Sequence, residues 1–260
     1  MKNFKLATYN VNSIRSRLHI VIPWMREFLP DILCMQETKV NNEQFPVNSF
    51  AEIGYQIYFS GSGRYNGVAI ASREHAQDVS HGFPDDCTDA DRLITAKFPQ
   101  LTIINAYVPQ GREKDSPHFA YKLKWFEHFY EMLCANFHPD EMLLVCGDLN
   151  VAPDPFDVHN PARLRGHVCF TEEVWDVYRQ WQIWGLNDIF RKFHPQEEGC
   201  FSFFDYRVPN AIDKGLGWRI DHILATKPLS DKATNCVIDT APRRATKPSD
   251  HTPIIATFVL

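Results

Sequence analysis

The chain has 260 residues, of which 44% are hydrophobic and 23% are charged, and its formal net charge at pH 7 is -5. These proportions are typical of globular proteins, so they exclude disordered, collagen-like and low-complexity classes and favour a single domain over residues 1–260. The acidic balance argues against a protein that coats nucleic acid through bulk charge, although a local basic face or a metal ion can still recruit phosphates.

The sequence predicts neither a membrane span nor a disulfide framework. Its longest stretch without a charged residue, 98–111, is too short and too polar to cross a bilayer. The N-terminus leads into a strand-like run without an apolar signal core, so we expect an intracellular, cytoplasmic protein. The seven cysteines are scattered and include no CxxC pair, so we expect most of them to be reduced packing residues.

Strand and helix patterns follow one another along the whole chain. Alternating or short apolar runs predict strands over residues 4–10, 32–35, 56–60, 68–72, 93–97, 101–106, 142–146, 201–206, 223–226, 236–239 and 254–259. Apolar residues at helical spacing predict helices over residues 18–29, 119–133 and 172–184. Pro23 is expected only near the first turn of the first helix. The pattern indicates two sheets packed together with helices outside.

Polar residues that can do chemistry stand directly after several of these strands, where a rigid scaffold presents functional groups. Taken singly, each has a structural explanation as a turn, cap or surface residue. Taken together, the carboxylates and carboxamides are hard oxygen ligands that suit Mg²⁺ or Mn²⁺, and no Cys/His cluster offers a softer site. The candidates are Asn10, Asn12, Glu37, Asp148, Asn150, Asp221, Asp250 and His251.

Six short motifs contain these residues. They are TYNVNSIR at 8–15, PDILCMQETK at 30–39, NAYVPQG at 105–111, GDLN at 147–150, GWRID at 217–221 and KPSDHTP at 247–253. In this order and spacing they resemble the exonuclease III type of apurinic/apyrimidinic endonuclease, in the exonuclease-endonuclease-phosphatase superfamily. The resemblance covers nearly the whole chain, and six ordered motifs are far more specific than any one of them alone.

The resemblance implies an α/β fold: a four-layer α/β sandwich in which two mixed β-sheets pack face to face, with helices on both outer sides. It also implies a metal site in a cleft where the strand ends converge. Glu37 would be the main carboxylate ligand of a Mg²⁺ ion, or of Mn²⁺, with Asn10, Asn12 and Asp250 around it, directly or through water. Some relatives have Asp at the position of Asn12, so this chain has one charge fewer there and is expected to bind metal more weakly.

The resemblance further implies roles in phosphodiester hydrolysis. Asp148 would orient or deprotonate the attacking water, and Asn150 would help to hold that water. Tyr107 would contact the phosphate, and Asp221 would fix the tautomer of His251, whose outer nitrogen faces the scissile phosphate. Asp148 is favoured as the general base, but the pairing of Asp221 with His251 permits either assignment.

Substrate choice is expected to depend on residues outside the metal centre. By resemblance, Phe203, Trp218 and Ile220 would form an apolar pocket for the abasic sugar, although each has an alternative explanation as a core side chain. Gln110, Arg112 and Arg207 are expected to contact DNA. Further basic residues that could line a phosphate-tracking face are Lys114, Lys122, Lys124, Lys214 and Arg219.

The resulting expectation is a monomeric, nucleoid-associated DNA repair nuclease. It would use Mg²⁺ to hydrolyse the phosphodiester 5′ to an abasic site in double-stranded DNA, with 3′-5′ exonuclease and 3′-end-cleaning activity. Its partners would be duplexes with abasic sites or blocked 3′ ends. Two alternatives stay open: another phosphodiesterase of the superfamily acting on RNA or a small phosphoester, and a non-catalytic DNA-binding member. The six motifs leave the balance among these activities undetermined.

Overall fold

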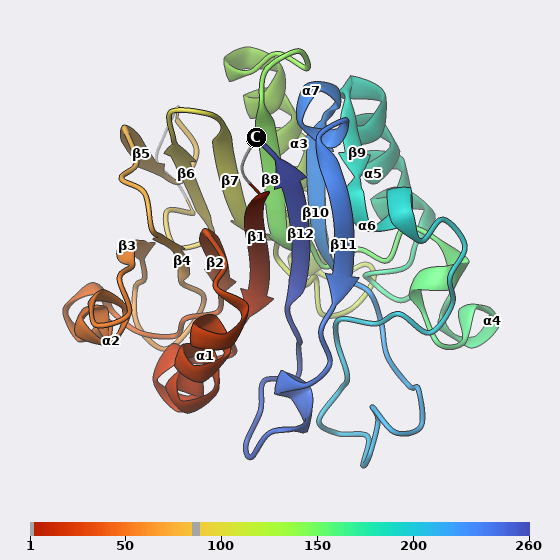
Figure 1. Ribbon diagram of the computed structural model, residues 1–260. Helices are drawn as coiled ribbons and strands as arrows, with labels where there is room; N and C mark the ends of the chain where they lie inside the picture. The colour runs from red at the N-terminus through yellow and green to blue at the C-terminus, as the bar shows by residue number, and fades with distance from the viewer. Residues whose placement is uncertain (1–2, 85–88) are drawn as a thin grey trace.

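The computed structural model describes residues 3–84 and 89–260, whose strands form two six-stranded mixed sheets (Figure 1). The sheets pack face to face, because β1, β2 and β4 of one sheet contact β8, β7 and β6 of the other. Helices cover the two outer faces. The predicted four-layer α/β sandwich is therefore confirmed.

The first sheet brings the two ends of the chain together. Its strand order is β11-β12-β1-β2-β4-β3, with β1 and β2 parallel and the other neighbours antiparallel. Since β1 lies between β2 and β12, the first motif lies beside the last one. The bounds are β1 (Asn3–Asn10), β2 (Ile32–Gln36), β3 (Gln56–Ser60), β4 (Val68–Ser72), β11 (Ala233–Ile238) and β12 (Ile254–Val259).

The second sheet is built from the middle of the chain. Its order is β5-β6-β7-β8-β10-β9, and β7 and β8 are its parallel pair. Gly147 in β8 has φ +137°, and a Cβ there would lie 1.9 Å from the carbonyl oxygen of Ala106, so the close pairing next to Asp148 needs glycine. The bounds are β5 (Asp78–His81), β6 (Leu93–Lys97), β7 (Thr102–Tyr107), β8 (Leu143–Asp148), β9 (Leu186–Asp188) and β10 (Asp221–Thr226).

The helices begin and end at residues with clear local reasons. Ser116 and Thr171 cap α3 and α5 by accepting hydrogen bonds from the backbone N–H groups of Phe119 and Val174, and Gly185 ends α5 with φ 133°. The α-helices are α1 (Ile14–Phe28), α2 (Val47–Ala51), α3 (Pro117–Asn136), α4 (Pro161–Leu164), α5 (Glu172–Trp184), α6 (Ile189–Phe193) and α7 (Lys227–Ser230). Short 3₁₀ helices are η1 (Asn42–Gln44), η2 (Pro155–Asp157) and η3 (Pro242–Arg244).

Three apolar layers hold these elements together. Leu6, Ile70 and Ile103 belong to the layer between the two sheets. A second layer packs α1 and α2 on the first sheet, and a third packs the aromatic faces of α3 and α5 on the second. Burial on both faces leaves the central strands almost without exposed side chains, so polar groups reach solvent only at the strand ends.

Two local predictions are wrong. Pro23 lies in the middle of α1, where its exposed ring faces solvent and water can satisfy the carbonyl group that a proline leaves without an N–H partner. Residues 201–206 form no continuous strand; Phe203 instead makes isolated bridges to Trp218 and His251. Backbone hydrogen bonds still link this segment to its neighbours, from Phe203 to Trp218 and from Phe204 to Asp250.

No helix among residues 3–84 and 89–260 is long and apolar enough to cross a membrane. The cysteines that the structure describes are all free thiols. Cys134 is exposed and Cys200 half-buried, whereas the others are packing residues as predicted: Cys34, Cys146, Cys169 and Cys236. Cys87 lies outside the described residues.

Candidate active site

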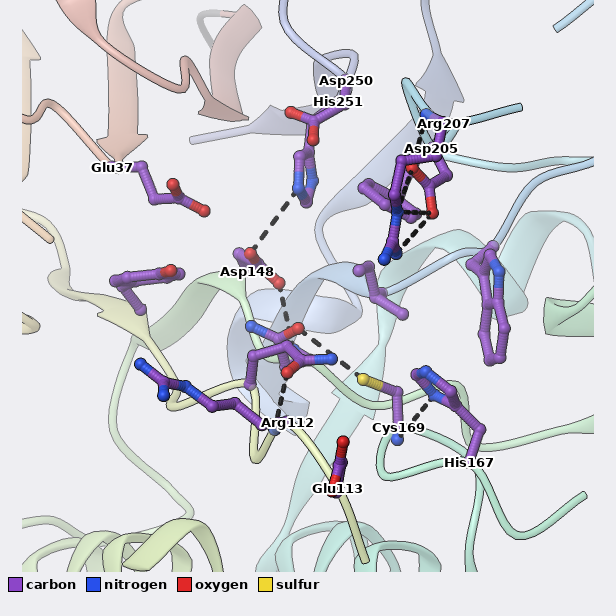
Figure 2. Close-up of a pocket in the computed structure, with 16 residues that line it drawn as sticks. Glu37, Arg112, Glu113, Asp148, His167, Cys169, Asp205, Arg207, Asp250 and His251 are labelled. Carbon is purple, nitrogen blue, oxygen red and sulfur yellow. Dashed lines mark hydrogen bonds and ion pairs between the residues drawn. The ribbon is translucent and has the colours of Figure 1, made fainter. Parts of the chain in front are cut away.

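Strand ends from both sheets meet at one edge of the sandwich and line a cleft of about 570 Å³ (Figure 2). Asn10 ends β1, and Glu37 follows β2, its parallel neighbour. Tyr107 and Asp148 are paired at the ends of parallel β7 and β8. Asp221 begins antiparallel β10 and pairs directly with Asp148. These polar groups therefore meet because the directions of the strands place their ends at the same edge of the sandwich.

Two carboxylates and an imidazole form the centre of the cleft. One ligand atom from each of Glu37, Asp148 and His251 lies within 4.8 Å of the others. The side-chain amide of Asn10, which is fully buried, donates to Glu37 Oε1 at 2.8 Å and to Asp148 Oδ2 at 2.9 Å. Asn10 thus bridges the two carboxylates. Their oxygens form a possible acidic metal site.

Lys39 extends this cluster and was not singled out from the sequence. Its ammonium group lies 2.6 Å from Glu37 Oε2 and donates to Asn12 Oδ1, also at 2.6 Å. Asn12 in turn donates to Asp250 Oδ1 at 2.9 Å. Asn12 and Asp250 therefore reach the Glu37 carboxylate through Lys39. The position of Lys39, two residues after Glu37 in the second motif, was the available signal.

His251 is held by a buried carboxylate. Its Nδ1 lies 2.8 Å from Asp221 Oδ2, which also accepts a hydrogen bond from Ser202 Oγ at 2.6 Å. Because a carboxylate only accepts, Nδ1 carries a proton and Nε2 points into the cleft, 3.8 Å from Asp148 Oδ2. Ser249 Oγ accepts from the His251 backbone N–H and donates to the Asn10 carbonyl oxygen, which ties the His251 loop to β1.

Burial and neighbouring charges shift the pKa values of these groups in opposite directions. Burial raises the pKa of Asp148 to about 7, and although His251 opposes this, Asp221 and Glu37 reinforce it. Burial would lower the pKa of His251, but Asp221 and Asp148 outweigh it and raise that pKa to about 10. Burial would also raise the pKa of Glu37, yet Lys39 and Asn10 lower it below its ordinary value. At neutral pH Glu37 is an anion and His251 a cation.

Asn150 and Tyr107 complete the polar wall of the cleft. Asn150 adopts φ 50°, and its backbone N–H donates to Asp148 Oδ1 at 3.1 Å, so the two side chains are held in one tight turn. Burial, followed by the charges of Glu37 and Asp148, raises the pKa of Tyr107 well above its ordinary value. The Tyr107 hydroxyl therefore stays a proton donor. Arg92 packs over its ring at 4.8 Å.

An apolar pocket adjoins the polar groups. Phe203, Trp218 and Ile220 all line the cleft, and the Phe203 ring packs 4.9 Å from the His251 ring. His167 and Cys169 also line it, and sequence reasoning missed both. The His167 ring lies 4.7 Å from that of Trp218. No motif in the sequence marks this loop.

The predicted DNA-contact residues divide into two groups. Gln110, Arg112 and Arg207 line the cleft, and both arginines are exposed. Lys114, Lys124 and Lys214 are exposed as well. Lys122 and Arg219, by contrast, are fully buried, so their expected place on a phosphate-tracking face is wrong.

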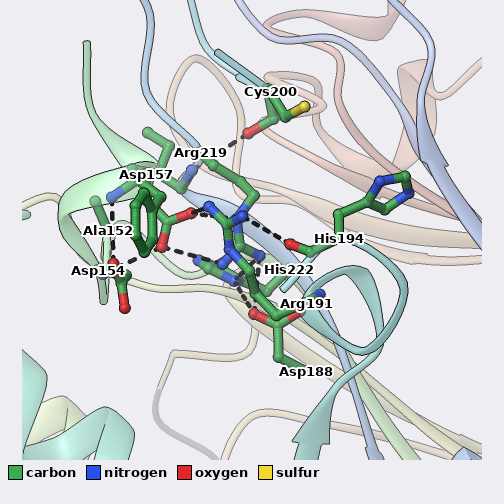
Figure 3. Close-up of polar contacts among 12 residues, drawn as sticks. Ala152, Asp154, Asp157, Asp188, Arg191, His194, Cys200, Arg219 and His222 are labelled. Atoms are coloured by element: carbon green, nitrogen blue, oxygen red, sulfur yellow. Dashed lines mark hydrogen bonds and ion pairs between the residues drawn. The ribbon is translucent and has the colours of Figure 1, made fainter. Parts of the chain in front are cut away.

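The buried charge of Arg219 belongs to a polar network beneath the cleft. Its guanidinium pairs with Asp157 at 2.6 Å and Asp188 at 2.9 Å, and donates to His222 Nδ1 at 3.0 Å (Figure 3). These partners satisfy the guanidinium inside the protein. Arg219 therefore anchors the segment between Trp218 and Asp221 from below and is not available to DNA.

Paired carboxylates beside a cationic histidine suit the hydrolysis of phosphate esters, which places the protein among the phosphoester hydrolases. Residues 7–251 match the model of the Endonuclease/Exonuclease/phosphatase family, and the chain belongs to this family. Exodeoxyribonuclease III of Haemophilus influenzae is 34% identical over 98% of this chain and 99% of its own. DNA repair nuclease APEX1 of Danio rerio is 32% identical over 97% of this chain and 81% of its own.

Solved structures agree with this assignment. An AP endonuclease from Archaeoglobus fulgidus has 52% sequence identity and a TM-score of 0.96, covering 99% of this chain and 100% of its own. The 3′ phosphatase NExo from Neisseria, bound to a product DNA hairpin, has 33% sequence identity and a TM-score of 0.92. The match covers 99% of this chain and 100% of that of NExo. The expected resemblance is confirmed, and the chain is a hydrolase of the nuclease class.

Proposed function

We propose that the protein is a DNA repair nuclease that cuts double-stranded DNA on the 5′ side of an abasic site and leaves a 3′ hydroxyl. The observation that carries this proposal is the meeting of Glu37, Asp148 and His251 beside the pocket of Trp218 and Ile220 in one cleft. A phosphodiester requires positive charge and hydrogen-bond donors, whereas a sugar without its base requires a small apolar pocket. The cleft offers both side by side.

The residues fit a hard divalent cation, for which we propose Mg²⁺, with Mn²⁺ as a substitute. Glu37 would hold it, with Asn10, Asn12 and Asp250 around it, directly or through water. Oxygen donors of this kind suit these ions, and the ammonium group of Lys39 lies between the oxygens of Glu37 and Asn12, which supports a cation-binding role for them. When bound, the ion would stabilise negative charge on the phosphate and on the leaving oxygen.

Asp148 and His251 divide the proton chemistry. The pKa of Asp148, raised to about 7, suits a general base that accepts a proton from water near neutral pH. The pKa of His251, raised to about 10, keeps it an imidazolium, which serves better as a hydrogen-bond donor to a phosphate oxygen than as a base. This contrast supports Asp148 over His251 as the base, with Asp221 holding the orientation of the charged His251 ring.

Asn150 and Tyr107 orient the reactants. Asn150 shares its turn with Asp148 and would hold the attacking water beside that carboxylate. The protonated Tyr107 hydroxyl would donate to the phosphate from the other wall of the cleft. Donors fixed in advance cost little reorganisation when the transition state forms.

The pocket of Phe203, Trp218 and Ile220 would receive the extruded abasic sugar, whose removal from the duplex is easiest because no base pair is lost. Gln110, Arg112 and Arg207 would contact the flanking DNA. The similarity to the 3′ phosphatase NExo supports an additional 3′-end-cleaning activity, and with it 3′-5′ exonuclease action on blocked ends. We also infer a monomer with residues 1–260 in one domain, acting inside the cell at the nucleoid.

A duplex oligonucleotide with one tetrahydrofuran lesion, incubated with Mg²⁺ in the presence or absence of EDTA, tests this function. We expect one cut directly 5′ to the lesion with Mg²⁺ and none with EDTA. An undamaged duplex is the matched substrate control. Uncut lesion DNA in the presence of adequate Mg²⁺ would refute the proposal.

A further inference from the structure

Lys122 is a buried cation directly behind the cleft. It lies on the inner face of α3 with a fully buried side chain, in line with Phe119, Phe126 and Phe129. Lysine is almost never fully buried unless a partner compensates its charge, so this position requires an explanation. Core packing alone would be served better by an apolar side chain.

The ammonium group of Lys122 bonds to three separate loops. It donates to the carbonyl oxygens of Asn150 and Val168, both at 2.7 Å, and of Gln110 at 3.3 Å. A tetrahedral ammonium has three N–H donors, so one carbonyl from each loop uses its full donor capacity. Its stem packs beside Gly111 and its charge lies 5.8 Å from the Phe126 ring.

Each of these loops supplies a wall of the cleft. The Gln110 loop carries Arg112, and Asn150 lies in the turn with Asp148. Val168 lies between His167 and Cys169, and the thiol of Cys169 contacts the side-chain oxygen of Asn150 at 3.7 Å. Backbone hydrogen bonds join these loops in pairs: the Val108 N–H donates to the Asp148 carbonyl oxygen at 2.9 Å, and the Ala152 N–H donates to that of Cys169 at 2.8 Å. Lys122 adds a single centre that bonds to all three loops at once.

We propose that Lys122 is a positioning residue of the hydrolytic reaction, which fixes the Asp148–Asn150 turn relative to the two other cleft loops. This inference rests on the proposed function for the reaction itself. Without the ammonium group, three buried carbonyl oxygens would lack a donor, and the loops would move apart until water reached them. Arginine is no equivalent, because its planar donors cannot point at three carbonyls in tetrahedral directions.

The test compares Lys122→Met with the wild type, using Lys232→Met as the matched control, since Lys232 is exposed and does not line the cleft. Single-turnover cleavage of the lesion duplex should be about 30- to 100-fold slower in Lys122→Met, in the range typical of a displaced catalytic group. The dissociation constant for lesion DNA, measured in EDTA, should change less than threefold. Such a split between rate and binding is not expected from a purely structural role, which would change only the folded fraction.

Hydrogen-deuterium exchange provides a readout without substrate. Amides in residues 108–112, 148–151 and 167–170 should exchange faster in Lys122→Met, whereas those of β1 and β2 should not. If the wild type fails to cut lesion DNA, the proposed function fails, and the exchange pattern still decides the role of Lys122. A cleavage rate within threefold of wild type, or unchanged exchange in the three segments, would overturn the inference.

If Lys122→Met does not fold, as judged by circular dichroism, Lys122→Arg is measured in its place. Arginine keeps the positive charge and has several N–H donors, so some of the buried carbonyl oxygens keep a hydrogen-bond partner. The same loss of rate and the same faster exchange are expected, because the planar group cannot satisfy all three carbonyls. A wild-type rate in Lys122→Arg would show that loop geometry does not depend on the ammonium group.

Discussion

The contact between Asp221 and His251 makes a quantitative prediction for Asp221→Asn. The rise in the pKa of His251 from 6.5 to about 10 corresponds to roughly 5 kcal/mol in favour of the imidazolium. Asp221, 2.8 Å away and fully buried, is the largest favourable contributor. Replacing it by a neutral amide should lower the pKa of His251 by about one to three units. The amide NH₂ can also donate to Nδ1 and hold the other tautomer of the imidazole, so kcat should fall about 10²- to 10⁴-fold.

The assay is kcat/KM on the lesion duplex between about pH 6 and pH 10. A raised histidine pKa means that the imidazolium persists at neutral pH and is lost only as the pH rises toward 10. In Asp221→Asn the alkaline loss of activity should therefore begin at a lower pH. Asp213→Asn, which changes an exposed carboxylate paired with Arg244, is the control. If kcat/KM of Asp221→Asn falls at the same alkaline pH as that of the wild type, this reasoning is refuted.

Three further substitutions probe the other parts of the cleft. Asp148→Asn should reduce turnover at least about 10³-fold while lesion DNA still binds, as shown by fluorescence anisotropy; a wild-type rate would remove Asp148 from the mechanism. Trp218→Ser should impair cleavage at an abasic site more than 3′-5′ exonuclease activity, and equal losses in gel assays would instead indicate core packing. Arg112→Ala should weaken DNA binding and reduce the slope of log K against log salt by about one, and an unchanged slope would exclude a phosphate contact.

Most of the fold could be predicted from the sequence because it depends on periodicity. Apolar alternation and buried runs predicted the strands of the two sheets except β5 and β9, and helical spacing predicted α3 and α5. The short elements were not predicted, because β9 and α6 contain too few residues for a period to show. Pro23 was misplaced because proline is usually confined to the first turn of a helix, whereas here it lies on the exposed face in the middle of α1.

The residues at the centre of the cleft could also be singled out, because they stand at the ends of strands within short motifs. Their catalytic roles stay predictions. Contacts between residues that are distant in the sequence could not be predicted. Lysine in a sequence normally indicates a surface charge, yet Lys122 falls at helical spacing between Phe119 and Phe126, on the buried face of α3. That spacing was the signal that could have revealed it. Arg219 gave no comparable signal, because its partners Asp157 and Asp188 are distant in the chain.

The account depends on Glu37 and its neighbours binding one hard cation at the phosphate site. Isothermal titration of Mg²⁺ into the wild type and into Glu37→Gln, each with lesion DNA bound, tests this most directly. Lesion DNA bound to Asp148→Asn serves as a reference in which turnover is at least about 10³-fold slower. The account predicts at least tenfold weaker Mg²⁺ binding after Glu37→Gln, because one of the carboxylate charges is lost. Equal Mg²⁺ affinity in Glu37→Gln and wild type would contradict it.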